Sequence, residues 1–183
     1  MNRIPNISFI SQWEYMNPSY RSAMEDVSIV NLALKDNCNV SLIALLDGHG
    51  GWKSFFLSYV GCATASFVST HLGDNLYEAL QQDDFTTFED AIRYAFYYTD
   101  MECRMQNLMA SGCTCAALIL VFNEKTRQRT LYSANIGDSR IVLYSSGTAT
   151  RLSYVLLSQL YSCRITKRKI SRKSLVLFQQ AGW

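Results

Sequence analysis

An almost entirely apolar run at residues 40–46 leads without a break into the motif DGHGG at residues 47–51. A short apolar run bounded by turn residues is typical of a buried strand. A carboxylate, a flexible glycine backbone and an imidazole are therefore expected together where this strand ends. That combination gives a metal-dependent hydrolase a ligand and a proton donor next to each other. On its own, the motif is also consistent with a simple glycine-rich turn.

A second strand is predicted directly before this one. Residues 27–34 are rich in β-branched and apolar side chains, and residues 35–37 form a polar turn. Two strands so close in the chain favour a hairpin. The hairpin would bring Glu25 and Asp26 to the same end of the sheet as Asp47.

The remaining pattern favours an α+β fold, in which helices cover a sheet layer. Aromatic and apolar residues recur at three- and four-residue spacing from residue 52 and predict a helix that ends near Gly73. A second helix is predicted over residues 88–109, with Thr86 and Glu89 as a capping box. Further strands are predicted at residues 114–122, 129–136 and 140–144, with a short piece ending near residue 152.

Composition indicates a single folded domain. The 183 residues are 49% apolar and 17% charged, which is typical of globular chains and not of disordered ones. The longest apolar run, residues 115–122, has eight residues and is too short to span a membrane. We expect no signal peptide, and we expect the chain in the cytoplasm, the nucleus or both. The six cysteines lack paired spacing, which favours buried free thiols.

Charge divides the chain near residue 150. Residues 1–150 hold 10 Lys and Arg against 15 Asp and Glu, a net charge of −5, whereas residues 151–183 hold 7 and none, a net charge of +7. Such a change at one point indicates that a different kind of segment begins there. Six basic residues lie within residues 164–173 and suggest binding to nucleic acid or anionic lipid, or a nuclear localisation signal. The alternative is a chance out-of-frame peptide without function.

Acidic side chains collect at the predicted strand ends. Glu25, Asp26, Asp47 and Asp138 offer carboxylates, and Gly48 offers an unobstructed carbonyl. Mg²⁺ and Mn²⁺ prefer oxygen ligands, and paired ions clamp a phosphoryl group in two-metal sites.

Two further residues suit a phosphate substrate. His49 is able to protonate a leaving oxygen near neutral pH, and Arg21 is able to hold a phosphate through its forked donors. Singly, each of these residues is explained as well by a turn or a solvated surface. Together they favour a hydrolase site.

Four segments, in order, resemble the metal-dependent type 2C (PPM) protein serine/threonine phosphatases. They are RSAMED at residues 21–26, DGHGG at 47–51, SGCTCA at 111–116 and ANIGDSR at 134–140. No single segment is specific, but the ordered set is, and the resemblance covers roughly residues 9–153. It implies a β-sandwich flanked by helices, with a two-metal site at one end of the sandwich.

The resemblance also implies metal ligands. Asp47 would bridge two Mg²⁺ or Mn²⁺ ions, the Gly48 carbonyl would bind one ion and Glu25 would bind the other. Asp26 would ligate or orient metal-bound water, and Asp138 matches a position near a weaker third metal.

The implied activity is hydrolysis of phosphoserine and phosphothreonine in phosphoprotein substrates by a water that two metals activate. Arg21 would bind the substrate phosphate, and His49 would act as general acid.

The family pattern stops near residue 153. The family continues with an Asp-His pair and two later aspartates that complete the metal site, whereas residues 154–183 contain no acidic residue. We therefore expect a truncated family member. Residues 1–153 would be the N-terminal part of the phosphatase domain, and residues 154–183 a divergent basic tail.

A truncated site predicts weak metal binding and little activity by this chain alone. Without the late strands of the sandwich, we also expect sheet edges to be left uncovered. The alternatives are a non-catalytic, pseudophosphatase-like binding module and a non-functional truncated product.

Overall fold

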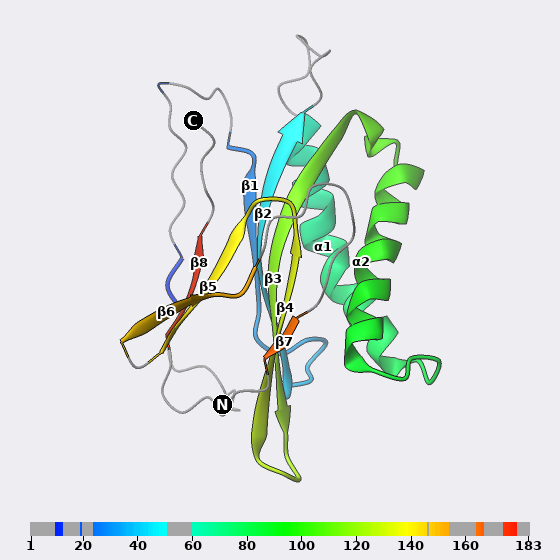
Figure 1. The fold of residues 1–183 in the computed structure, drawn as a ribbon. Helices are drawn as coiled ribbons and strands as arrows, with labels where there is room; N and C mark the ends of the chain where they lie inside the picture. Colours follow the sequence, from blue (N-terminus) through cyan, green and yellow to red (C-terminus); the bar gives the residue numbers. More distant parts are fainter. Residues whose placement is uncertain are drawn as a thin grey trace.

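The computed structural model describes residues 10–12, 19, 24–50, 60–145, 147–153, 164–166 and 174–178, in an α+β fold (Figure 1). The helices are α1 (Val60–Gln81), α2 (Phe88–Met105) and the single 3₁₀ turn η1 (Leu108–Ala110). The strands are β1 (Asp26–Asn31), β2 (Val40–Gly50), β3 (Ser111–Asn123), β4 (Gln128–Ile136), β5 (Arg140–Ser145), β6 (Thr148–Arg151), β7 (Arg164–Thr166) and β8 (Ser174–Phe178). The predicted fold class is confirmed.

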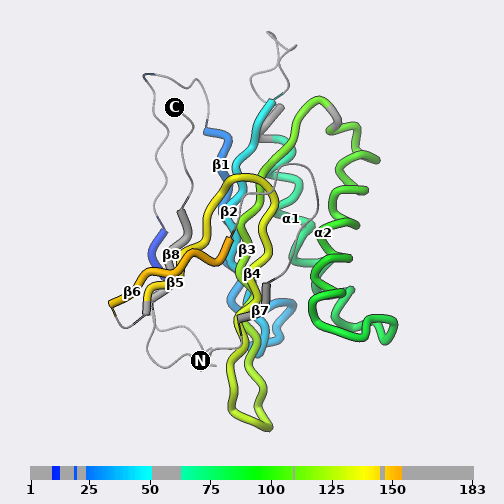
Figure 2. The backbone as a smooth tube through the Cα atoms, in the orientation of Figure 1, coloured from blue at the N-terminus to red at the C-terminus, as the bar shows by residue number. Residues whose placement is uncertain are grey.

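The strands form two antiparallel sheets. The larger has the order β1-β2-β3-β4-β7 and the smaller the order β6-β5-β8. Helices α1 and α2 lie against one face of the larger sheet, and the smaller sheet lies on its other side (Figures 1 and 2). The predicted arrangement of a β-sandwich flanked by helices therefore holds for the described residues.

Strand β3 separates two apolar cores. Cys115, Ala117 and Ile119 point toward the helices and belong to the larger core. The alternate residues Ala116 and Leu118 belong to a smaller core on the opposite face. Because successive side chains of a strand point to opposite faces, one continuous apolar run fills both cores.

Strands β1 and β2 form the predicted hairpin. In their antiparallel register Asp26 lies opposite Asp47, and Asn31 lies opposite Leu42. The hairpin therefore carries the acidic residues of both strands to one end of the sheet, as the sequence predicts.

Helix α1 does not end at Gly73, so that prediction is wrong. It runs on to Gln81 because Leu72, Leu76 and Ala79 are buried in the core, so that the helix gains by continuing past the glycine. A Cβ placed on Gly73 would lie 3.5 Å from Leu34 Cδ1, an ordinary contact that shows how closely the helix packs there. The predicted start of this helix, at residues 52–59, lies outside the described residues.

Helix α2 begins where predicted but is capped differently, and it ends at Met105 and not at residue 109. The N-cap is Thr87, whose side-chain oxygen accepts a hydrogen bond from the backbone N–H of Asp90 at 3.2 Å. The predicted capping box of Thr86 and Glu89 is therefore wrong by one residue. Thr87 has the extended backbone that an N-cap requires.

The segment beyond residue 153 contributes strands to both sheets. β7 pairs with β4, and β8 pairs with β5. The expectation that the tail leaves these strand edges uncovered is therefore wrong at these two places.

The expectations about a membrane span and about the cysteines can be compared with the structure. Within the described part of the chain, no helix combines the length and apolarity needed to cross a membrane. Cys38, Cys103, Cys113 and Cys115 are free thiols, as predicted.

Replacing Thr87 by alanine should lower the free energy of unfolding by about 1 kcal/mol, because the Asp90 N–H loses its acceptor. The matched change Thr86→Ala should cost clearly less, since Thr86 accepts no helix N–H and only donates to the Asp90 carboxylate at 3.3 Å. Urea unfolding followed by circular dichroism measures both. A larger loss for Thr86→Ala than for Thr87→Ala would contradict the cap assignment.

Candidate metal site at the end of the first hairpin

Two carboxylates face each other across the β1–β2 hairpin. Asp26 and Asp47 are direct partners in the register, and Asp47 is also opposite Thr114 of β3. Directly opposed residues on antiparallel strands have Cβ atoms about 4.5–5.5 Å apart and share one face of the sheet. Like charges in this position repel each other, and a cation between them would offset the repulsion.

The backbone of Gly48 is fixed by its neighbour across the hairpin. Its N–H donates to the carbonyl of Glu25 at 3.1 Å, one residue beyond the last ladder pair. This bond extends the hairpin up to the acidic pair. Gly48 is buried, whereas Glu25 is half-buried, so that the Glu25 side chain has access to solvent at the strand end.

His49 lies against a glycine of β3. It pairs in register with Gly112, and a Cβ at Gly112 would come within 2.7 Å of the imidazole Cε1 and 3.0 Å of Nε2. The absence of a side chain at Gly112 therefore makes room for the ring. His49 itself is exposed to solvent.

Asp138 lies on an exposed turn between β4 and β5 that hydroxyl groups anchor to β3. The Thr114 and Ser139 hydroxyls are hydrogen-bonded at 2.6 Å, and Ser139 is buried. The Ser153 hydroxyl accepts from the Ile141 N–H at 2.9 Å and lies 3.5 Å from the Ser139 carbonyl oxygen. These bonds fix the chain that directly follows Asp138.

Thr114 and Ser139 lie in two of the four segments that resemble the family, but the sequence indicates no role for them or for Ser153. Thr114 carries a further signal, because it is the single hydroxyl-bearing residue in the otherwise apolar run at residues 114–122. Ser153 gave no signal, since its role depends on a contact with Ser139 that is not local in the chain.

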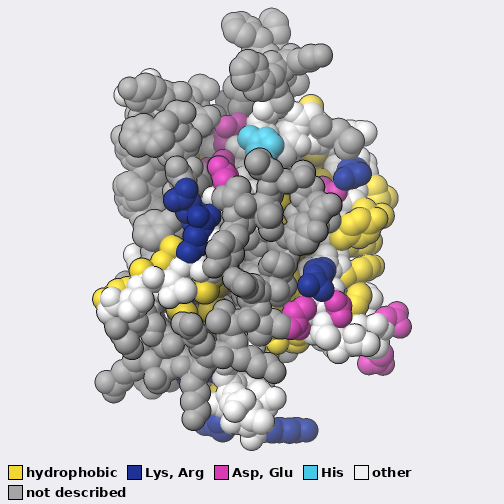
Figure 3. Space-filling view, in the orientation of Figure 1, with side chains coloured by type: hydrophobic (Ala, Val, Ile, Leu, Met, Phe, Trp, Pro, Cys, Tyr) yellow, Lys and Arg dark blue, Asp and Glu magenta, His cyan; other side chains and the backbone are white. Residues whose placement is uncertain are grey.

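The oxygen atoms of the described residues are of the type that a hard divalent cation prefers as ligands. Mg²⁺ retains several waters and is commonly held by one or two carboxylates, which the opposed Asp26 and Asp47 supply. Figure 3 shows acidic side chains close to a histidine on one face of the molecule. Among the residues that the structure describes, however, no group of three or more His, Cys, Asp or Glu is placed to hold a metal ion.

The predicted site is thus brought together in part. Asp26 joins Asp47 across the hairpin, and Glu25 joins Gly48 through the backbone bond. The assignment of Glu25, Asp26, Asp47, Gly48 and Asp138 as metal ligands stays a prediction.

The two residues assigned to the substrate stay predictions as well. Arg21 lies outside the described residues, so the structure does not place it. His49 is described, and its role as general acid remains to be tested.

Comparison with known proteins identifies the family. The family model described as protein phosphatase 2C matches residues 16–155, more than half of the chain. The chain therefore belongs to the protein phosphatase 2C family. The predicted division into residues 1–153 and 154–183 stays a prediction.

Curated relatives match between two thirds and four fifths of the chain. Protein phosphatase 2C homolog 1 of Saccharomyces cerevisiae is 28% identical over 152 residues, which cover 77% of this chain and 50% of that protein. Probable protein phosphatase 2C 20 of Arabidopsis thaliana is 32% identical over 131 residues, which cover 71% of this chain and 40% of that protein. The chain thus spans about half the length, or less, of these relatives.

Solved structures support the fold. A phosphatase from Toxoplasma gondii superposes with a TM-score of 0.54 at 18% identity, covering 72% of this chain and 45% of that one. A sex-determining protein of C. elegans gives 0.52 at 20% identity, covering 74% and 32%. At these identities the similarity concerns the fold alone.

Replacing Gly137 by alanine should destabilise the protein by more than the same change at Gly147. Both glycines have positive φ, +88° and +80°, which costs a residue with a side chain about 1–2 kcal/mol. Only at Gly137 would the new Cβ also meet Thr114, at 2.7 Å from Cγ2 and 2.8 Å from Cβ. Urea unfolding of both variants isolates this contact, and equal losses would show that the turn is not held against β3.

Proposed function

We propose that this chain carries the metal-binding end of a protein serine/threonine phosphatase, which hydrolyses phosphoserine and phosphothreonine in phosphoprotein substrates. The observation that carries the proposal is the register that sets Asp26 opposite Asp47, in a chain of the protein phosphatase 2C family. Opposed carboxylates at a strand end can coordinate a cation, and a bound cation can in turn coordinate the oxygens of a phosphate ester.

The proposed cofactor is Mg²⁺ or Mn²⁺, with two ions in the intact family site. Asp47, the Gly48 carbonyl and Glu25 would hold them, with Asp26 and Asp138 as further ligands or as partners of bound water. When bound, such ions polarise the phosphoryl oxygens and lower the pKa of coordinated water. The Gly48–Glu25 backbone bond supports this assignment because it fixes the peptide next to the acidic pair.

His49 and Arg21 would act on the substrate. His49 is exposed and would donate a proton from its imidazole to the leaving seryl or threonyl oxygen. The room over Gly112 supports this role, since the ring needs no displacement to occupy its place. Arg21 would bind the phosphate through its guanidinium group.

A second candidate function is a non-catalytic, phosphatase-like binding module. It is favoured by a specific observation: within the described residues, no three potential ligands gather into one metal site. Residues 154–183 contain no acidic residue that would add one.

The basic segment at residues 164–173 and the compartment are separate proposals. We propose that the protein is located in the cytoplasm or the nucleus. We also propose that residues 164–173 contact nucleic acid or anionic lipid. Its charge, six basic residues in ten, supports binding to polyanions.

Manganese should stabilise the protein through Asp47. At a concentration of about ten times Kd, binding adds roughly 1.4 kcal/mol, or about 3–6 °C in Tm for a domain of this size. Asp47→Asn should abolish the shift, whereas Asp84→Asn, on the exposed connection between α1 and α2, should leave it intact. Differential scanning calorimetry with and without MnCl₂ measures it, and the same shift in Asp47→Asn would exclude this residue as a ligand.

Activity separates the two candidate functions. The 183-residue chain should hydrolyse a phosphothreonine peptide slowly and only with Mn²⁺, and Asp47→Asn should lower the rate at least tenfold, as measured by phosphate release. Binding of Mn²⁺ without hydrolysis would favour the binding module. Hydrolysis at the same rate in EDTA would overturn the proposal.

A further inference from the structure

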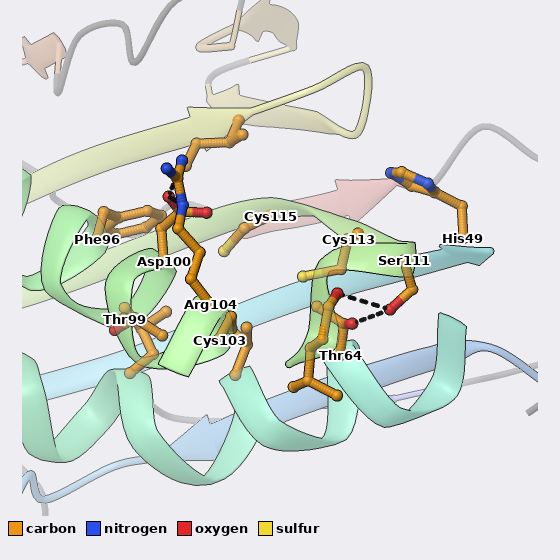
Figure 4. A pocket seen from close by; sticks show the side chains of 15 residues that line it. His49, Thr64, Phe96, Thr99, Asp100, Cys103, Arg104, Ser111, Cys113 and Cys115 are labelled. Atoms are coloured by element: carbon orange, nitrogen blue, oxygen red, sulfur yellow. Dashed lines mark hydrogen bonds and ion pairs between the residues drawn. The ribbon is translucent and has the colours of Figure 1, made fainter. Parts of the chain in front are cut away.

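A cavity of about 400 Å³ lies between α1, α2 and β3, on the helix side of the larger sheet (Figure 4). Apolar side chains form much of its wall, among them Val68 and Leu72 of α1 and Phe96 of α2. Three thiols also line it: Cys103 of α2, and Cys113 and Cys115 of β3. Ligand pockets commonly have volumes of about 300–1,000 Å³, so the cavity is large enough for a small molecule.

The polar groups of the wall bind mainly to one another. The hydroxyls of Thr64 and Ser111 are hydrogen-bonded to each other (Figure 4). The Thr99 hydroxyl donates to a carbonyl of its own helix at 2.7 Å. The carboxylate of Asp100 and the guanidinium of Arg104 form an ion pair at 2.8 Å. The charges of Asp100 and Arg104 are thus paired with each other and do not call for a charged ligand.

The thiols are neutral at physiological pH. Burial raises the pKa of Cys113 to about 12, with a further contribution from nearby Cys103. Burial also raises the pKa of Cys103 and of Cys115. Protonated thiols act as small, polarisable apolar groups that make favourable contacts with aromatic rings.

We propose that this cavity binds an uncharged, mainly apolar small molecule of one or two aromatic rings. Its size and its mainly apolar, thiol-bearing wall favour such a ligand over an ion or a phosphate. Binding of such a ligand requires neither the metal ions nor the proposed phosphatase activity.

The cavity shares a wall with the candidate metal site. Cys113 and Cys115 point into the cavity, and Thr114 between them is opposite Asp47. His49 and Gly112 stand at the cavity border. An occupant would therefore contact the strand end that also positions the acidic pair.

The test is a titration of the ¹⁵N-labelled 183-residue chain with indole, an uncharged two-ring probe, followed by ¹H–¹⁵N NMR. Indole should shift the amide signals of residues 112–115 and of α2, and leave those of β6 unchanged. Indole-3-acetate, which has the same ring and a negative charge, should bind at least tenfold more weakly. No saturable shift up to about 5 mM indole, or equal binding of both probes, would overturn the proposal.

Variants of the cavity wall test whether indole binds inside the cavity. Val68→Trp fills the cavity and should raise the Kd of indole at least tenfold. Ser66→Trp, on the exposed face of the same helix, should leave the Kd unchanged. Should Val68→Trp fail to fold, the isosteric change Cys113→Ser makes the wall more polar and should weaken binding severalfold. Unchanged binding in Cys113→Ser, together with shifts outside the cavity wall, would also contradict the assignment.

Discussion

The fold depends on one strand that is packed on both faces. β3 pairs with β2 along one side and β4 along the other, and Ala116, Ala117 and Ile119 are completely buried. The strand fixes the helical layer on one face and the smaller sheet on the other. Its N-terminal end also determines the chemistry, because Thr114 adjoins the acidic pair while Cys113 and Cys115 line a cavity behind it.

The sequence predicted those parts of the structure that short-range patterns determine. Residues 40–46 and 114–122 are predicted as strands because each is an almost entirely apolar run, as a strand buried on both faces requires. The short polar turn at residues 35–37 then fixed a hairpin, and with it the meeting of Asp26 and Asp47. Contacts between distant segments were beyond such patterns: nothing local to His49 indicates that Gly112 makes room for its ring.

Both helix corrections arise from packing that overrides a local signal. A glycine after an apolar stripe is a common helix end, yet α1 continues past Gly73 because Leu76 and Ala79 still have a core to enter. At α2, the spacing of Thr86 and Glu89 predicts a capping box, whereas the N-cap is the adjacent Thr87. The backbone N–H of Asp90 donates to the Thr87 hydroxyl, and this bond depends on the direction in which the chain enters the helix.

The position of the helices between β2 and β3 has a consequence for how the protein folds. The central pairing of the larger sheet, between β2 and β3, joins Gly50 to Ser111. The segment that contains both helices must therefore be synthesised before these two strands can pair. Contacts so distant in the chain carry a loop-closure cost and slow folding. At ribosomal speeds of roughly 5–20 residues per second, the free edge of β2 waits about 3–12 s for its partner. The apolar stretch that ends at the candidate metal site therefore stays without its β3 partner on a newly made chain until the helices have been synthesised.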